Sequence, residues 1–290
     1  MRARLDPEWL DGQYNNRSRV ADHAAILTSW SEASQLVIAS GSAQLDVPYG
    51  DGAGETLDVF PPHDAATSGG TAPVMVFIHG GYWRSLDKAD HAFVAPAFNA
   101  AGALVVVPNY ALCPSVTVEH ITLQMARAVL WVWRNAARLG ADPSRIMLAG
   151  HSAGGHLAAM LLCCRWKDLD ADAPAQLVTG ALSISGLFDM EPLRHTPFLQ
   201  QDLQLTPNAV ARLSPAFFPR PKVGKLYVTV GLDESDEFLR QSRLIREVWG
   251  PTAVPVCETV PRANHFNVLS QLVDPSARVH NLALRLLGLA

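Results

Sequence analysis

Cysteine is scarce in this sequence, with only four residues, Cys113, Cys163, Cys164 and Cys257, among 290. They form no Cys-x-x-Cys pair and show no spacing typical of a zinc site, so the pattern indicates neither a disulfide framework nor a metal centre. The neighbours Cys163 and Cys164 point in different directions on one predicted helix. We therefore interpret all four as buried free thiols in a reducing compartment.

Long apolar runs and an excess of one charge are also missing. No run approaches the ~18 apolar residues that a membrane-spanning helix needs. The charged start of the chain has no apolar stretch behind it, unlike a signal peptide. A formal net charge of −4, with both signs scattered, leaves no basic face for nucleic acid. With 49 % apolar residues, the chain is predicted to be globular and cytoplasmic, without a nucleic-acid or membrane partner.

Periodic patterns divide the chain into a helical start and a long alternating part. Apolar residues in the first forty positions recur at helical spacing. Two short strand patterns at 43–47 and 55–60 predict a hairpin at a sheet edge, and a loop is expected at 61–73. Further strands are predicted at 74–78, 104–107, 145–149, 178–184, 226–230 and 254–259, and helices at 87–101, 118–139, 237–248 and 275–287 and from near residue 152.

This alternation predicts an α/β fold. Continuous apolar runs such as 74–78 are typical of parallel strands covered on both faces. We expect one domain over residues 1–290, with a mostly parallel, doubly wound sheet and helices on both faces. Residues 187–222 interrupt the alternation with six prolines, and they are predicted to form a small cap.

The strongest local signal is Gly150-His-Ser-Ala-Gly154, which directly follows one strand pattern and precedes an apolar helix. A tight strand-to-helix turn lifts the oxygen of Ser152 above the sheet, and the helix N-terminus favours developing negative charge. Small residues are required at both ends of the motif because the backbone is crowded there. The motif predicts Ser152 as a nucleophile.

A second signal, His79-Gly-Gly-Tyr-Trp83, ends the strand pattern at 74–78. A tetrahedral intermediate needs N–H donors aimed at its oxygen, and glycines let the backbone turn its amides inward. His79 is interpreted as a residue that holds this loop. The predicted donors are the amides of Gly80, Gly81, Tyr82 and Ala153.

A base should follow the serine and the acid in the chain. His265 follows the last strand pattern and precedes a helix, whereas His195 falls in the predicted cap and His280 inside the terminal helix. We therefore predict that His265 is the base.

The acid lies within Gly231-Leu-Asp-Glu-Ser-Asp-Glu, which offers four carboxylates just past a buried strand pattern. Asp236 and Glu237 begin the next helix, where acidic residues favour the helix dipole, so capping is their expected role. We favour Glu234 as the acid, because three residues past the glycine the chain can turn inward to the imidazole. Asp233 stays the alternative, and it should face solvent if Glu234 is the acid.

Together these segments resemble the α/β-hydrolase superfamily, and within it the kynurenine formamidase (arylformamidase) branch near the hormone-sensitive-lipase esterases. The resemblance covers roughly residues 55–290, and it departs from the usual pattern at two points. Esterases usually have a third glycine after His79, and many relatives have aspartate at the position of Glu234. The resemblance rests on His79-Gly-Gly-Tyr-Trp83, Gly150-His-Ser-Ala-Gly-Gly-His156 and the stretch from Glu234 to Ser242.

The resemblance implies an α/β-hydrolase fold and hydrolysis of N-formyl-L-kynurenine to kynurenine and formate through an acyl-serine. It implies no metal and no organic cofactor, and a small acyl-aryl amide or ester as the partner. Tyr82, Trp83, Phe188 and Phe266 are candidates for an aromatic wall around the substrate. Two interpretations of Tyr14-Asn-Asn-Arg17 stay open: it binds a carboxylate or carbonyl over the site, or it forms a turn satisfied by its asparagines.

Two other functions stay open. The same motifs suffice for a general carboxylesterase of short-chain esters, because fold and triad do not fix the substrate. A non-catalytic hydrolase fold that acts as a binding protein is the second, and the intact Ser152, Glu234 and His265 argue against it. The sequence does not reveal the oligomeric state, and a homodimer is among the alternatives.

Overall fold

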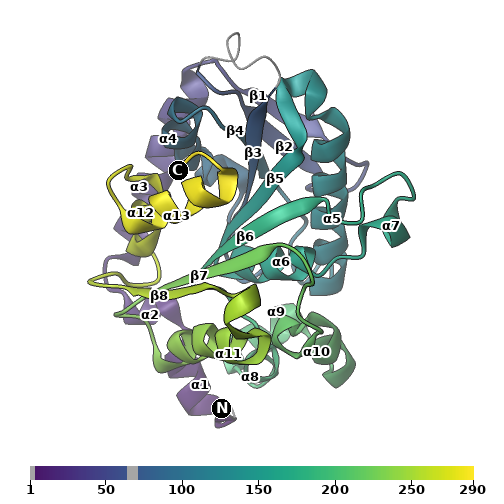
Figure 1. Ribbon diagram of the computed structural model, residues 1–290. Coiled ribbons are helices and arrows are strands. Elements are labelled where there is room, and N and C mark those ends of the chain that lie inside the picture. The colour runs from purple at the N-terminus through teal and green to yellow at the C-terminus, as the bar shows by residue number, and fades with distance from the viewer. Residues whose placement is uncertain (1–3, 64–70) are drawn as a thin grey trace.

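An eight-stranded sheet forms the centre of the computed structural model, which describes residues 4–63 and 71–290 (Figure 1). The strand order is β1-β2-β4-β3-β5-β6-β7-β8. Pairs β1–β2 and β2–β4 are antiparallel and the five other pairs are parallel, which confirms the predicted mostly parallel sheet. The strands are β1 (Gln44–Pro48), β2 (Thr56–Phe60), β3 (Ala72–Ile78), β4 (Leu104–Pro108), β5 (Ala141–His151), β6 (Val178–Ile184), β7 (Lys225–Gly231) and β8 (Val256–Val260).

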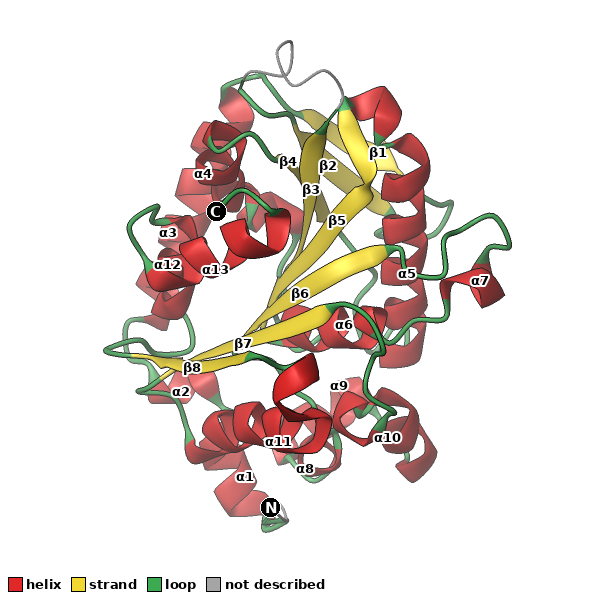
Figure 2. Ribbon diagram, in the orientation of Figure 1, coloured by secondary structure: helices red, strands yellow, loops and turns green. Residues whose placement is uncertain are grey.

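Helices cover both faces of this sheet (Figure 2). The longer ones are α3 (His23–Ala39), α5 (Val118–Asn135), α6 (Ala153–Leu162), α11 (Asp236–Ala253) and α13 (Arg278–Leu287). The shorter ones are α1 (Pro7–Tyr14), α2 (Asn16–Arg19), α4 (Ala95–Ala100), α7 (Trp166–Leu169), α8 (Glu191–Arg194), α9 (Pro197–Leu203), α10 (Pro207–Leu213) and α12 (Ser270–Val273). No helix within the described ranges is long and apolar enough to cross a membrane.

Side chains along β3 alternate between two hydrophobic cores. Val74, Val76 and Ile78 pack in one core with residues of α5, α6 and α11. Met75 and Phe77 pack in the other with residues of α3, α4 and α13. Every residue of β3 is buried, which explains its continuous apolar run, because a parallel strand under two helical layers has no face in water.

The prediction of one continuous helix over 87–101 is wrong. The segment is divided into the 3-10 helices η1 (Lys88–Asp90) and η2 (Ala92–Val94), followed by α4. Pro96 stands in the first turn of α4, where its missing N–H costs nothing, whereas inside a longer helix it would clash with the preceding turn. The expected loop at 61–73 lies largely outside the described residues, and its last residues, Ala72 and Pro73, belong to β3.

Helix α1 and the short helices α8 and α9 lie side by side near the lower end of Figure 1. Helix α1 contacts α8 and α9, which come from the segment predicted as a cap, and it also contacts α11. Helices α8, α9 and α10 each have a proline in the first turn, where its fixed φ suits helix initiation. Three of the six prolines that interrupt the alternating pattern thus begin short helices.

Candidate active site

Ser152 stands at the turn between β5 and α6. Its backbone has φ 56° and ψ −116°, a strained conformation for a residue other than glycine and one typical of a nucleophile at such a turn. A Cβ at Gly150 would lie 2.2 Å from the carbonyl oxygen of Gly154, and a Cβ at Gly154 would lie 1.9 Å from that of Ile78. Glycine is therefore required at both positions, as the sequence motif indicates.

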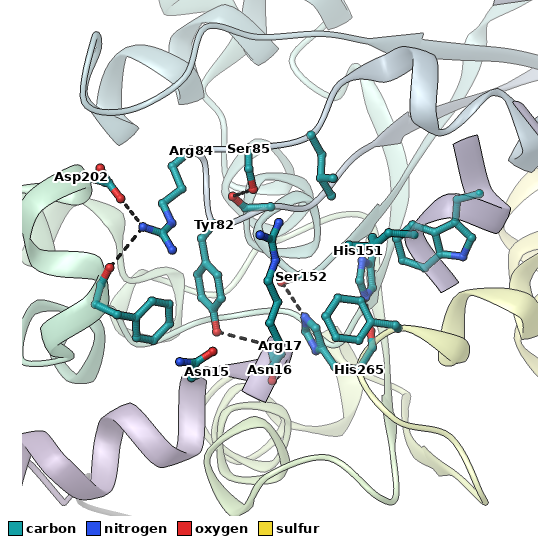
Figure 3. Close-up of a pocket in the computed structure, with 16 residues that line it drawn as sticks. Asn15, Asn16, Arg17, Tyr82, Arg84, Ser85, His151, Ser152, Asp202 and His265 are labelled. Atoms are coloured by element: carbon teal, nitrogen blue, oxygen red, sulfur yellow. Dashed lines mark hydrogen bonds and ion pairs between the residues drawn. The ribbon is translucent and has the colours of Figure 1, made fainter. Parts of the chain in front are cut away.

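The structure brings together the serine, histidine and glutamate that the sequence singles out. His265 Nε2 lies 3.0 Å from Ser152 Oγ (Figure 3), and His265 Nδ1 lies 2.6 Å from Glu234 Oε2. All three residues are buried, whereas Asp233 is exposed. Glu234 follows β7 and His265 follows β8, so the loops at the carboxyl ends of three parallel strands place the three side chains.

Two donors hold the second oxygen of Glu234. Ser185 Oγ donates a 2.5 Å hydrogen bond to Oε1, and the backbone N–H of Gly231 donates a 2.8 Å bond to the same atom. A carboxylate that receives such bonds has a fixed orientation toward its imidazole partner. Sequence reasoning missed Ser185, whose one visible signal is that it directly follows the β6 strand pattern.

The loop after β3 packs tightly against the serine turn. Gly81, Tyr82 and Trp83 all have positive φ, at 104°, 49° and 56°, so the backbone turns sharply here. A Cβ at Gly80 would lie 3.1 Å from Ser152 Cβ, and one at Gly81 would lie 2.1 Å from the carbonyl oxygen of Ser85. The close approach brings Gly80 next to Ser152, whereas Gly81 packs against Ser85.

His79 holds this loop, as the sequence indicates. Its Nδ1 lies 2.8 Å from the carbonyl oxygen of Gly80 and its Nε2 lies 3.1 Å from Asn109 Oδ1. The ring stacks on Tyr110 with the centroids 4.2 Å apart. Burial lowers the pKa of His79, so the imidazole is neutral at pH 7 and donates its single N–H to one of these two oxygens.

A second buried histidine, His151, supports the backbone of His265. His151 Nε2 donates a 2.7 Å hydrogen bond to the carbonyl oxygen of His265. Burial, followed by the proximity of His265, lowers the pKa of His151 well below its usual value, so the ring is neutral and carries its proton on Nε2. His151 thereby fixes the backbone of the residue whose side chain reaches Ser152.

A cavity of about 420 Å³ opens beside Ser152 and His265 (Figure 3). Its walls come from the N-terminal helices, the loop after β3, the serine turn, the histidine loop and α9. The lining residues are Asn15, Asn16, Arg17, Leu27, Trp30, Gly81, Tyr82, Arg84, Ser85, Leu86, His151, Ser152, Phe198, Asp202, His265 and Phe266.

Two of the four aromatic residues expected at the substrate line this cavity, namely Tyr82 and Phe266. Trp83 and Phe188 do not line it, and both are fully buried in the core. Trp83 packs edge-on against His156 with the centroids 5.0 Å apart. The expectation that these two residues wall the substrate is therefore wrong, because proximity to a motif does not decide which way a side chain points. Trp30 and Phe198 supply aromatic surface instead.

The segment Tyr14–Arg17 forms the turn satisfied by asparagine that the sequence left open, and it also borders the cavity. Asn15 Oδ1 accepts a hydrogen bond from the N–H of Ser18 at 3.3 Å, as in an asparagine-capped turn. The same segment borders the cavity through Asn15, Asn16 and Arg17. Tyr82 joins it to the loop after β3, since its hydroxyl donates to the carbonyl oxygen of Tyr14 at 2.7 Å.

Glu237 does not act as a simple helix cap, contrary to expectation. It is buried in the first turn of α11, where its carboxylate accepts two hydrogen bonds from Arg240, at 2.7 and 2.9 Å. A third comes from the hydroxyl of Tyr14, at 2.6 Å. Arg240 also reaches Asp189 at 3.3 Å. Because a buried charge must be paired, this network is a strong constraint on how α1 packs against α11.

Clusters suited to a metal ion are not found in residues 4–63 and 71–290, where no three His, Cys, Asp or Glu side chains converge.

The residues His195 and His280, which the sequence places away from the site, form hydrogen bonds elsewhere. His195 Nε2 lies 2.9 Å from Glu191 Oε1, and His280 Nδ1 lies 2.8 Å from the carbonyl oxygen of Leu272.

Comparison with known proteins gives consistent similarities. Residues 75–242 match the model of a family described as having an alpha/beta hydrolase fold. Kynurenine formamidase of Danio rerio is 32 % identical over 92 % of this chain and 88 % of that protein. Kynurenine formamidase of Salmo salar is 30 % identical over 98 % and 96 %. A solved structure of a thioesterase candidate from Silicibacter sp. TM1040 is 30 % identical with a TM-score of 0.79, covering 93 % of this chain and 97 % of that one.

Proposed function

Because this chain belongs to the α/β hydrolase fold family, we propose that it is a serine hydrolase that removes the formyl group from aromatic formamides, with N-formyl-L-kynurenine as the substrate. One observation carries the proposal: Ser152, His265 and Glu234 form a continuous hydrogen-bonded chain beside a cavity with aromatic walls. The similarity to kynurenine formamidases over almost the whole chain supports the choice of substrate.

The proposed reaction begins with attack of Ser152 Oγ on the formyl carbon while His265 Nε2 accepts the serine proton. Glu234 holds the Nδ1–H of His265 and stabilises the imidazolium. The amides of Gly80, Gly81, Tyr82 and Ala153 are the proposed donors to the oxyanion, and removal of one such donor typically costs ~3–4 kcal/mol in the barrier.

Collapse of the intermediate breaks the C–N bond, and His265 returns its proton to the departing aryl amine. The product of this half-reaction is formyl-serine. Water then attacks the formyl carbon with His265 as base, which releases formate and restores the serine. The sum is one formamide and one water giving one amine and one formate, and it requires no metal or organic cofactor.

The cavity suits this class of substrate. Its volume of about 420 Å³ lies within the range of sites that enclose small organic molecules. Trp30, Phe198 and Phe266 present aromatic surface to it, and aromatic rings pack favourably on one another in offset or edge-to-face arrangements. The aryl ring of the substrate is proposed to pack there while the formyl group faces Ser152.

We also infer a cytoplasmic location for the enzyme. The four cysteines are all free thiols, but only Cys113 is buried and the other three are half-buried, so the expectation of four buried thiols is wrong for three of them. Burial still raises the pKa of Cys113 and of Cys163 to about 12. Such thiols stay protonated and unreactive, as expected of buried cysteines in a reducing compartment. Cell fractionation followed by immunodetection tests this inference, and recovery from a secreted or membrane fraction would contradict it.

The decisive experiment measures kcat/KM of the purified protein on N-formyl-L-kynurenine and on p-nitrophenyl acetate, with Ser152→Ala as the blank. A Ser152-dependent value above ~10⁴ M⁻¹s⁻¹ on the formamide, the lower end for ordinary enzymes, is the expected result. Absence of formamide cleavage by an active, folded enzyme would overturn the substrate assignment.

Hydrolysis of short-chain esters or thioesters is the alternative, because the same nucleophile and base act on any acyl carbon. The similarity to the thioesterase candidate supports this alternative. A Ser152-dependent preference for acetyl or butyryl esters over formyl anilides would select it. Labelling of Ser152 by a fluorophosphonate probe is expected for either enzyme, and its failure would point to a non-catalytic binding protein.

A further inference from the structure

We infer that Arg17 forms a carboxylate-binding subsite in the cavity beside Ser152, so that the substrate class is an aryl compound whose ring bears a side chain ending in a carboxylate. The nature of the bond cleaved rests on the function proposed above, whereas the anion-binding role rests on the placement and charge of Arg17 alone.

Arg17 brings an unpaired cation to the cavity. It belongs to α2, is exposed, and lines the same cavity as Ser152 and His265. In the view of Figure 3 its side chain extends from α2 into the space between Tyr82 and His265. Its guanidinium makes no hydrogen bond or ion pair with any residue in the described part of the chain. A planar guanidinium with free N–H groups is the side chain best suited to bidentate binding of a carboxylate.

The other formal charges on the cavity wall cancel each other. Arg84 forms an ion pair with Asp202, and it also donates a 3.2 Å hydrogen bond to the carbonyl oxygen of Phe198. Glu234 is not a lining residue, since it lies behind His265 and is held by Ser185. Arg17 therefore leaves the cavity with one uncompensated positive charge, which favours an anionic ligand over a neutral or cationic one.

The turn that carries Arg17 is anchored at two of its residues by the Tyr82 hydroxyl. The carbonyl oxygen of Tyr14 accepts a 2.7 Å hydrogen bond from the Tyr82 hydroxyl. Asn16 is buried, and its Nδ2 lies 3.4 Å from the same hydroxyl. A binding group on a fixed turn loses little backbone entropy when the ligand arrives, so more of the interaction energy appears as affinity.

This placement separates the two ends of the substrate. The acyl carbon must reach Ser152, and the aryl ring has Trp30 and Phe266 to pack against. A third group on the ring is needed to reach Arg17, and a short aliphatic ester has none. The subsite therefore discriminates between an aryl formamide with an acidic side chain and the same formamide without one.

The test compares wild type, Arg17→Ala and Arg17→Lys on N-formyl-L-kynurenine and on the neutral formamide 2′-formamidoacetophenone. We expect Arg17→Ala to raise KM about 10- to 100-fold on the carboxylate-bearing substrate with kcat nearly unchanged, the range for a lost hydrogen bond to a charged group. The neutral formamide should be cleaved as by wild type. The KM of Arg17→Lys on the carboxylate-bearing substrate should lie between those of wild type and Arg17→Ala, since lysine keeps the charge but lacks the bidentate geometry.

Arg19→Ala is the matched control, because Arg19 is an exposed arginine of the same short helix and does not line this cavity. It should behave as wild type on both substrates. Equal losses on both substrates after Arg17→Ala, or no loss on either, would overturn the subsite.

Failure of the formamidase assignment can be distinguished from failure of the subsite. If wild type cleaves esters but no formamide, the same variants are compared on 3-(2-acetoxyphenyl)propanoate and 2-propylphenyl acetate, whose rings bear a side chain with and without a carboxylate. A loss by Arg17→Ala confined to the propanoate would support the subsite although the formamidase assignment has failed. A parallel response on the two esters would overturn it.

Discussion

The hydroxyl of Tyr14 donates a 2.6 Å hydrogen bond to Oε2 of Glu237, which lies 223 residues away in the chain. The Nε2 of Gln241 donates to the same hydroxyl oxygen at 3.0 Å. Because Tyr14 immediately precedes the residues that border the cavity, this bond ties one wall of the site to α11.

Loss of that bond should lower stability. Tyr14→Phe leaves the buried carboxylate of Glu237 with one donor fewer, so we expect the free energy of unfolding to fall by about 1.5–3 kcal/mol, the range for hydrogen bonds to charged groups. Urea denaturation followed by circular dichroism measures the change. Tyr227→Phe is the control, since the Tyr227 hydroxyl makes no hydrogen bond within the described residues. Equal stability of the two variants would contradict the role of the Tyr14–Glu237 bond.

Glu234 and Asp233 are neighbours with opposite surroundings, which separates their expected roles. Glu234→Gln should lower kcat by ~10³–10⁴, by analogy with loss of the acid in other triads. Asp233→Asn should stay near wild type because Asp233 is exposed. Steady-state kinetics on whichever substrate the enzyme prefers will measure both. The reverse pattern would transfer the role of the acid to Asp233.

Ser185 is predicted to be a positioning residue for Glu234. Ser185→Ala removes the 2.5 Å hydrogen bond to Oε1, and we expect kcat to fall about 10-fold, within the energy of one hydrogen bond to a charged group, while KM changes little. Ser183→Ala is the matched control from the same region, because the Ser183 hydroxyl is buried without a partner among the described residues. If the two variants have the same kcat, Ser185 does not position the acid.

Acid should destabilise the fold through its buried histidines. Burial lowers the pKa of His156 to about 4 and, with the nearby His79, that of His91 to about 3. In the unfolded chain these side chains bind a proton near pH 6.5. The unfolded state therefore binds more protons between about pH 6.5 and 4, so stability is complete above this window and falls as the pH falls through it.

The slope expected from each such histidine is up to about 1.4 kcal/mol per pH unit. Urea denaturation at pH 7, 6 and 5 measures it for wild type and for His156→Gln. The variant removes one titrating group, so its stability should fall less steeply with acid. Identical slopes would show that His156 does not remain unprotonated in the folded protein.

Local patterns were enough to predict the parts of the site that depend on neighbours in the chain. Gly150 is required by its contact with Gly154 inside the serine turn, whereas Gly154 is required by its contact with Ile78 at the end of β3. The motif identifies the turn, although only the first glycine is explained by neighbours in the chain. The strand patterns are equally local, because a strand buried on both faces must be apolar throughout. His265 was found by its position after the last strand.

Contacts between distant segments could not be predicted in this way. Ser185 reaches Glu234 because β6 and β7 are adjacent, a fact that neither strand pattern contains. Glu237 looks like an ordinary first-turn acid until Tyr14 is brought to it from the other end of the chain. Trp83 and Phe188 adjoin functional segments, yet their side chains point into the core, and only the packed structure shows this.

The cavity is built from two sets of segments that are separate in the chain. Ser152, Glu234 and His265 stand on loops that follow β5, β7 and β8, whereas Asn15 to Trp30 and the α9 residues Phe198 and Asp202 supply much of the remaining wall. Substrate range and chemistry can therefore diverge independently during evolution. Exchange of the N-terminal helices between relatives would change which acyl compound is admitted while the acyl-transfer apparatus stays in place.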